Sequence, residues 1–319
     1  MIKFACQHEN SKKHDRDKFG QQRRKCLDCG ITFIELKTKL LGDSRLPVDR
    51  AVLCLKMLLE GVSIRATSRL TGTDKNAIIS LVTTLGPRCQ RFLKSRIQDV
   101  PVQEVECDET WGFIGMKEKT CERLQRGSEY GDCYPYIAME RNTKLVLTWS
   151  VGKRASEECW SFIDDLRFAT SGRFQLSTDG YTPYQSAVPL IFNFDVDFSQ
   201  VIKRFSGSSD TEAGRRYSPA NITSVKVTQG CGNPDLDRAC TSHSERLNLS
   251  IRMQNRRMTR LTNGHSKKWD NHEAMMGLYF AWYNFCRKHM TVKTSPAVAQ
   301  GLTDHVWTLE ELLAEIATF

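Results

Sequence analysis

The stretch Glu104–Gly115 reads Glu-Val-Glu-Cys-Asp-Glu-Thr-Trp-Gly-Phe-Ile-Gly and combines the composition of a β-strand with a row of acids. Its β-branched and aromatic residues favour a strand, yet carboxylates stand at Glu104, Glu106, Asp108 and Glu109. Burying carboxylates side by side in a sheet costs several kcal/mol unless a cation compensates their charge. Because divalent metal ions prefer such oxygen ligands, the stretch predicts one wall of a metal site.

Two later stretches supply the remaining acids of such a site. In 176–181 a short apolar strand runs into Asp179 and a glycine turn, and 242–252 reads as the start of a basic helix that carries Glu245. Two aspartates at strand ends and a glutamate on a helix form a three-carboxylate site for two metal ions, with Asp108 bridging both. The pattern therefore predicts Mg²⁺- or Mn²⁺-dependent in-line displacement at phosphorus.

Each of these acids also has a plainer interpretation. An Asp-Gly pair such as that at Asp179 is a common turn, and Glu245 suits the start of a helix because of the helix dipole. The sequence does not fix which acid of the first strand points inward. Glu106 and Glu109 therefore stay open as alternatives to Asp108.

The predicted helix carries a basic stripe. Arg252 lies seven residues after Glu245, two helical turns on and on the same face, where it would hold a DNA phosphate near the metals. Arg256 and Arg260 continue the stripe at four-residue steps. His243, although it is near Glu245, is interpreted as a solvated side chain rather than a ligand. The predicted DNA-binding residues are Arg23, Arg24, Lys25, Lys75, Asn76, Arg246, Arg256 and Arg260.

The charge balance favours a polyanionic partner. The 319 residues include 46 Lys+Arg and 37 Asp+Glu, a net charge of +9, and residues 246–268 hold basic residues without a single acid. The N-terminus lacks an apolar signal core, and no run approaches the ~20 apolar residues of a membrane span. We therefore expect a cytoplasmic, nucleoid-associated protein with double-stranded DNA as its partner and no membrane.

The first 40 residues have the pattern of a zinc ribbon. Cys26-Leu-Asp-Cys29 is a metal knuckle, and Cys6 and His8 offer the other pair of a Cys₃His set for a structural Zn²⁺. The spacing of the Cys-x-His half is irregular, so His14 is an alternative fourth ligand. A basic arm with incidental cysteines is the plainer interpretation.

Residues 47–98 follow helical periodicity. An apolar helix ends near Gly61, Ser63 caps a short helix, and Gly72 marks the turn to a third helix. A short helix, a glycine turn and a second helix form a helix-turn-helix. The predicted outer face of its recognition helix carries Asp74, Lys75, Asn76 and Ser80. A plain helical bundle explains the apolar spacing equally well.

From residue 102 the pattern changes to that of a mixed sheet. We expect strands at 102–115, 134–141, 145–152, 174–177 and 198–202, and helices at 156–170, 184–188, 241–262, 268–290 and 309–317. Three strands, a helix, a strand, a helix and a strand is the order of the ribonuclease-H-like fold. The polar segment 116–132 is expected to be a hairpin loop, and 206–240 a long loop over the active site.

Three blocks, 108–115, 178–184 and 244–252, resemble the catalytic blocks of transposases of the insertion-sequence-one family. The resemblance covers residues 1 to about 290, because that family also carries a zinc motif and a helix-turn-helix. It implies a DDE-type transposase with Asp108, Asp179 and Glu245 as its triad. Such an enzyme cuts and joins DNA at the terminal inverted repeats of its own insertion sequence. The segments 206–240 and 297–319 depart from the family pattern.

Taken together, the patterns and the resemblance predict a multi-domain α/β chain. The expected parts are a zinc ribbon (1–40), a helix-turn-helix domain (45–98), a ribonuclease-H-like mixed-sheet catalytic domain (102–290) and a C-terminal tail with a helix (291–319). Synapsis of two element ends implies a homodimer or a larger assembly on repeat and target DNA. The alternative is a catalytically inactive, transposase-derived DNA-binding regulator. A structure-selective nuclease on the same core is a third possibility, although it would not need the two N-terminal modules.

Overall fold

The computed structural model describes residues 10–16, 22–34, 39–206 and 222–319. The chain divides into two compact units, Met1–Leu40 and Leu41–Phe319. Two of the four predicted zinc ligands, Cys6 and His8, lie outside the described residues.

The first unit contains a three-stranded antiparallel sheet with a tight turn at the predicted knuckle. Its strands, in sheet order, are β1 (Ser11–Arg16), β2 (Gln22–Cys26) and β3 (Thr32–Ile34). After β2, the Gly30 N–H donates to the Cys26 carbonyl at 3.1 Å, and the Cys26 N–H donates to the Ile31 carbonyl at 2.9 Å. Gly30 has φ +74°, a left-handed conformation that glycine adopts without strain. The turn thus has the form of the predicted knuckle, while metal binding there stays a prediction.

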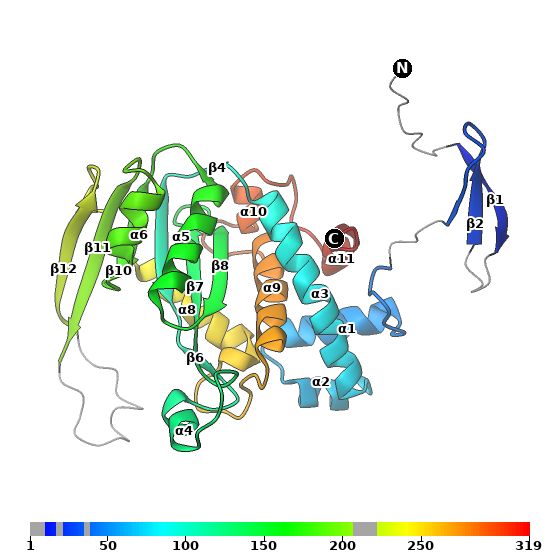
Figure 1. Ribbon diagram of the computed structural model, residues 1–319, viewed down its shortest axis with the longest axis horizontal. Coiled ribbons are helices and arrows are strands. Elements are labelled where there is room, and N and C mark those ends of the chain that lie inside the picture. Colours follow the sequence, from blue (N-terminus) through cyan, green and yellow to red (C-terminus); the bar gives the residue numbers. More distant parts are fainter. Residues whose placement is uncertain (1–9, 17–21, 35–38, 207–221) are drawn as a thin grey trace. The chain divides into compact units, whose positions relative to one another are not determined.

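The second unit is built on a mixed sheet. Its strands are β5 (Glu104–Glu109), β6 (Gly112–Ile114), β7 (Gly131–Glu140), β8 (Val146–Gly152), β10 (Gln175–Asp179), β11 (Asp197–Phe205) and β12 (Ile222–Cys231). Their order is β12-β11-β10-β5-β7-β6, with β8 also paired to β7 (Figure 1). β5, β10 and β11 are parallel, whereas β7, β8 and β12 run antiparallel to their partners. This order is compatible with the predicted ribonuclease-H-like core.

Helices cover both faces of the sheet, and further helices pack together at one side of it. They are α1 (Val48–Leu59), α2 (Ile64–Thr71), α3 (Lys75–Arg96), α4 (Glu118–Arg123), α5 (Ser156–Ala169), α6 (Tyr184–Ile191), α8 (Ser242–Gln254), α9 (Trp269–Phe285), α10 (Pro296–Ala299) and α11 (Leu309–Ile316). A 3₁₀ turn, η1 (Arg256–Met258), follows α8, and β4 (Val100–Pro101) pairs with β9 (Thr170–Ser171). α5 and α6 pack together on one face, while α8 packs on β5 from the other (Figure 1).

The local signals at the predicted helix-turn-helix are confirmed. The Ser63 side chain accepts the Ala66 N–H at 3.1 Å and so caps α2. Gly72 ends α2 at φ +66°, and Asp74 caps α3 by accepting the Asn76 N–H at 2.8 Å. These helices belong to the same compact unit as the sheet, and α3 lies beside α9 (Figure 1). Their use in DNA binding stays a prediction.

Four predicted segments differ from the structure. The single strand expected at 102–115 is divided into β5 and β6. The expected loop 116–132 contains α4, and the expected loop 206–240 contains β12. β12 has the β-branched residues of a strand and pairs with β11 from Phe198 to Phe205, which its Ser- and Gly-rich flanks obscured. The expected helix 241–262 ends at Gln254. The Asn255 side chain accepts the Arg257 N–H at 3.2 Å, and this local bond competes with the helical pattern.

Candidate active site

A cleft of about 490 Å³ opens where β5 and β10 end. Asp108, Asp179 and Glu245, the three carboxylates singled out in the sequence, all line it. The other lining residues are Arg154, Gly180, Tyr181, Thr182, Val201, Ile202, Lys203, Phe205 and Thr241. The fold therefore brings together three acids that are far apart in the chain.

The register of two parallel strands explains why the aspartates are neighbours. Thr178 of β10 pairs with Cys107 of β5, and the next residue of each strand is Asp179 and Asp108. Residues at equivalent positions of adjacent parallel strands point to the same face, with the strands about 4.8 Å apart. Both carboxylates therefore reach the same end of the sheet.

The third carboxylate is positioned by the docking of α8 on β5. Glu106, which is only 1% exposed, accepts the N–H groups of His243 and Ser244 on Oε2 at 2.9 and 3.0 Å. A carboxylate from another element thus caps the first turn of α8. Because Glu106 lies two residues before Asp108 on the same face, this cap sets Glu245 beside Asp108.

The structure decides which of the three acids left as alternatives by the sequence faces the cleft. Of Glu106, Asp108 and Glu109, Asp108 is the one that lines the cleft. Glu109 points to the opposite face of β5, where the Tyr184 hydroxyl donates to its Oε1. Tyr184 is fully buried. Burial and the nearby charge of Asp179 raise the pKa of Glu109 to about 7.

The carboxylates repel one another. Burial, followed by the charges of Asp179, Glu109 and Glu245, raises the pKa of Asp108 well above its ordinary value. Asp108 Oδ2 accepts a hydrogen bond from Asn248 Nδ2 at 2.8 Å, and burial likewise raises the pKa of Asp179. Oxygen ligands held together against their own repulsion fit a hard divalent cation such as Mg²⁺ or Mn²⁺.

Two cationic side chains in the cleft were missed by the sequence analysis. Arg154 Nη2 lies 3.6 Å from Asp179 Oδ2 and 3.2 Å from Glu109 Oε2, and its guanidinium stacks 4.4 Å from the Tyr181 ring centroid. Lys203 forms an ion pair with Glu245. Neither belongs to a recognisable sequence motif. Arg154 follows β8 in the chain, and Lys203 lies within β11. Only the fold reveals their proximity to the acids.

Arg252 lies on the predicted face of α8 but turns toward the sheet. Its Nη2 donates to the Trp111 carbonyl at 3.3 Å, and burial lowers its pKa. The basic stripe does not continue as predicted, because α8 has ended before Arg256 and Arg260. Arg256 is instead part of η1.

The predicted DNA-binding residues lie in β2, α3, α8 and η1, and Arg260 lies in a turn after η1. Lys25, Lys75, Asn76, Arg246 and Arg260 are exposed, and Arg23, Arg24 and Arg256 are half-buried. Arg23 pairs with Asp15 at 3.2 Å, and Arg24 Nε donates to Ser11 Oγ at 3.0 Å. Their contacts with DNA stay predictions.

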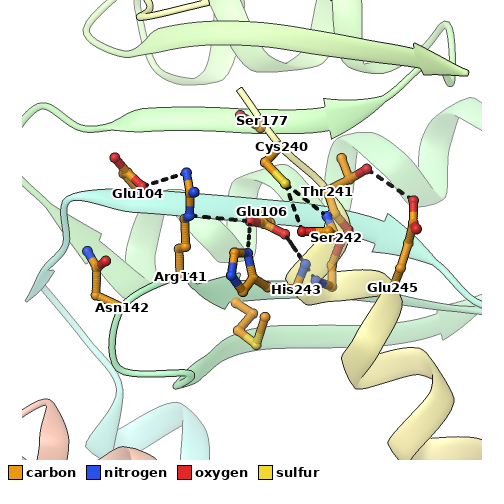
Figure 2. A network of polar contacts seen from close by, with 12 residues as sticks. Glu104, Glu106, Arg141, Asn142, Ser177, Cys240, Thr241, Ser242, His243 and Glu245 are labelled. Atoms are coloured by element: carbon orange, nitrogen blue, oxygen red, sulfur yellow. Dashed lines mark hydrogen bonds and ion pairs between the residues drawn. The ribbon is translucent and has the colours of Figure 1, made fainter. Parts of the chain in front are cut away.

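His243, interpreted from the sequence as a solvated side chain, is half-buried and contacts a buried carboxylate. Its Nδ1 lies 2.7 Å from Glu106 Oε1, and the two residues form a potential metal-binding group with Cys240 (Figure 2). This group cannot be recognised from the sequence, because Glu106 is more than a hundred residues from Cys240 and His243. The contact depends on the docking of α8.

Comparisons with known proteins assign no family. No family model and no curated protein matches the chain. Among solved structures, the piggyBac transposase in a synaptic complex with hairpin DNA is 10% identical, with a TM-score of 0.41, over 84% of this chain and 69% of that one. An endonuclease V from Bacillus subtilis is 13% identical, with a TM-score of 0.21, over 62% of this chain and 87% of that one. Similarity this low leaves the function to be argued from the site.

Within the described residues, none of the helices has both the length and the apolar character that a bilayer span requires.

Proposed function

We propose that this protein is a DDE-type DNA transposase of the insertion-sequence-one kind. The observation that carries the proposal is the convergence of Asp108, Asp179 and Glu245 on one cleft. Two come from the ends of adjacent parallel strands and one from a helix. The substrates would be the terminal inverted repeats of its own element and a target duplex.

The three carboxylates would hold Mg²⁺ or Mn²⁺. When bound, such ions activate the attacking hydroxyl or water and stabilise the leaving 3′-oxygen. Asn248 orients Asp108 through its 2.8 Å hydrogen bond, and Glu106 fixes the helix that carries Glu245. Arg154 and Lys203 add positive charge to the wall along which a phosphodiester backbone would lie.

Substrate recognition falls to the N-terminal elements in this proposal. The knuckle at Cys26 and Cys29 would complete a structural Zn²⁺ site with Cys6 and His8. The exposed first turn of α3, with Lys75 and Asn76, would enter the major groove. A synaptic homodimer or larger assembly would then hold two element ends.

The test is cleavage of a labelled duplex that carries the flanking terminal repeats, with Mg²⁺ present. Wild-type protein should nick at the 3′ end of the repeat. Asp108→Asn, Asp179→Asn and Glu245→Gln should each abolish the cut and still bind the repeat. Glu157→Gln, an exposed acid on α5 outside the cleft, is the matched control and should cut normally.

Two outcomes would change the assignment. Tight repeat binding without cleavage by the wild type would favour the DNA-binding regulator. Cleavage that survives one of the three substitutions would remove that carboxylate from the triad.

A further inference from the structure

A second group of potential metal ligands lies beside the cleft, at the start of α8 (Figure 2). Glu106 of β5, Cys240 and His243 each offer one donor atom, and the three atoms lie within 4.8 Å of one another. We propose that the Glu106–Cys240–His243 cluster binds a divalent ion of the zinc class. This site would be distinct from the carboxylate cleft and would take a different metal.

The two carboxylate oxygens of Glu106 have different partners. Oε2 accepts both backbone N–H groups of the first turn of α8, from His243 and Ser244. Oε1 faces His243 Nδ1 at 2.7 Å. An ion bound between Oε1 and the imidazole would therefore leave the helix cap intact.

The nearby arginine does not block this site. Arg141 Nε lies 3.9 Å from Glu106 Oε1, but its Nη1 forms a closer ion pair with Glu104 at 2.9 Å (Figure 2). Arg141 thus keeps a carboxylate partner when an ion takes Oε1. Glu106 gains a second positive neighbour without leaving a buried charge unpaired.

Cys240 supplies the donor that selects the metal. Its sulfur accepts the Ser242 N–H at 3.3 Å and lies 2.9 Å from Ser242 Oγ, so it is held against the start of the helix. A thiol beside helix-terminal N–H groups is a typical environment for a cysteine that binds metal. Sulfur and imidazole ligands favour Zn²⁺ or Co²⁺ over Mg²⁺.

The dimensions suit a tetrahedral ion. Zn²⁺ bonds of about 2.0–2.3 Å place neighbouring ligand atoms roughly 3.3–3.8 Å apart. Shifts of about an ångström by the half-buried Cys240 and His243 would meet this requirement. Three protein ligands leave a fourth position for water, which reaches the site because both side chains are partly exposed.

The test measures metal content of the full-length protein, with Co²⁺ as the probe, by dialysis and absorption spectroscopy. Cys240→Ser and His243→Asn should each bind one fewer ion per chain than the wild type. The matched control is Cys231→Ser, a half-buried thiol in β12 outside the cluster, which should bind the full number. Equal Co²⁺ content and affinity in Cys240→Ser and the wild type would overturn the proposal.

A second measurement needs no variant. Alkylation of Cys240 in the wild-type protein, followed by mass spectrometry, should slow about tenfold at a Zn²⁺ concentration ten times the dissociation constant. Mg²⁺ at the same concentration should leave the rate unchanged. Alkylation that is equally fast with and without Zn²⁺ would overturn the proposal, whatever becomes of the DNA-cleavage assay.

Discussion

Asp108 and Glu106 lie two residues apart on the same face of β5, yet their surroundings are opposite. Asp108 faces the carboxylates of Asp179 and Glu245, and this repulsion together with burial raises its pKa. Glu106 faces donors instead: two backbone N–H groups, the imidazole of His243 and a guanidinium. Burial alone therefore does not mark an acid of the carboxylate cleft. The informative feature is an acid whose charge the chain leaves uncompensated.

The largest effect should come from Asp108→Asn. Loss of one metal-binding carboxylate should slow Mg²⁺-dependent cleavage about a thousandfold or more, because it removes several kcal/mol of transition-state stabilisation. The same change should raise the free energy of unfolding of the metal-free protein by less than about 1 kcal/mol, since the relief of repulsion outweighs the loss of one of the two oxygens that accept N–H groups. Denaturation in the presence of EDTA measures the free energy of unfolding, and the cleavage assay measures the rate. A variant that loses both stability and activity would contradict the contrast between Asp108 and Glu106.

Glu106→Ala should act in the opposite direction on stability. The His243 and Ser244 N–H groups would lose a buried acceptor and Arg141 an ion-pair partner, which should lower the free energy of unfolding by about 3 kcal/mol. Glu106→Gln keeps an oxygen for the two N–H groups and should lose only about 1 kcal/mol. Urea denaturation of both variants makes the comparison. Equal losses would show that the charge matters rather than the helix cap.

Glu109, on the other face of β5, should make the metal-free fold sensitive to pH. Burial raises its pKa from 4.5 to about 7. A folded-state pKa above the unfolded value means that the folded protein binds the proton more tightly. This stabilisation, up to about 3 kcal/mol, is therefore present below pH 4.5 and lost as the pH rises through 7. Unfolding curves of the wild type and Glu109→Gln should diverge across this range, and parallel curves would refute the prediction.

The smallest effect concerns the cations of the cleft. Arg154→Met should let Mn²⁺ bind about two- to fivefold more tightly, because the half-exposed guanidinium beside Asp179 no longer competes. Lys153→Met is the matched control, since Lys153 pairs with Glu118 instead. Isothermal titration measures both. Equal affinities for all three proteins would mean that Arg154 does not oppose metal binding.

Local signals accounted for much of the fold. The capping residues Ser63 and Asp74, the turn at Gly72 and the strand patterns around Asp108 and Asp179 all predicted elements that the structure contains. These signals succeed because they depend on hydrogen bonds and side-chain periodicity within a few residues. They failed at β12 and at the end of α8, where pairing with β11 and the Asn255 side chain decided the outcome.

The sequence by itself determined which residue types were available: acids at two strand ends and on one helix, and a Cys-x-x-Cys turn. Only the tertiary structure decided that Asp108 rather than Glu106 or Glu109 lines the cleft. It also brought Arg154 and Lys203 to the acids, and His243 to Glu106. The physical reason is that alternation along a strand fixes only which residues share a face. The strand register and the docking of α8 decide what each face meets.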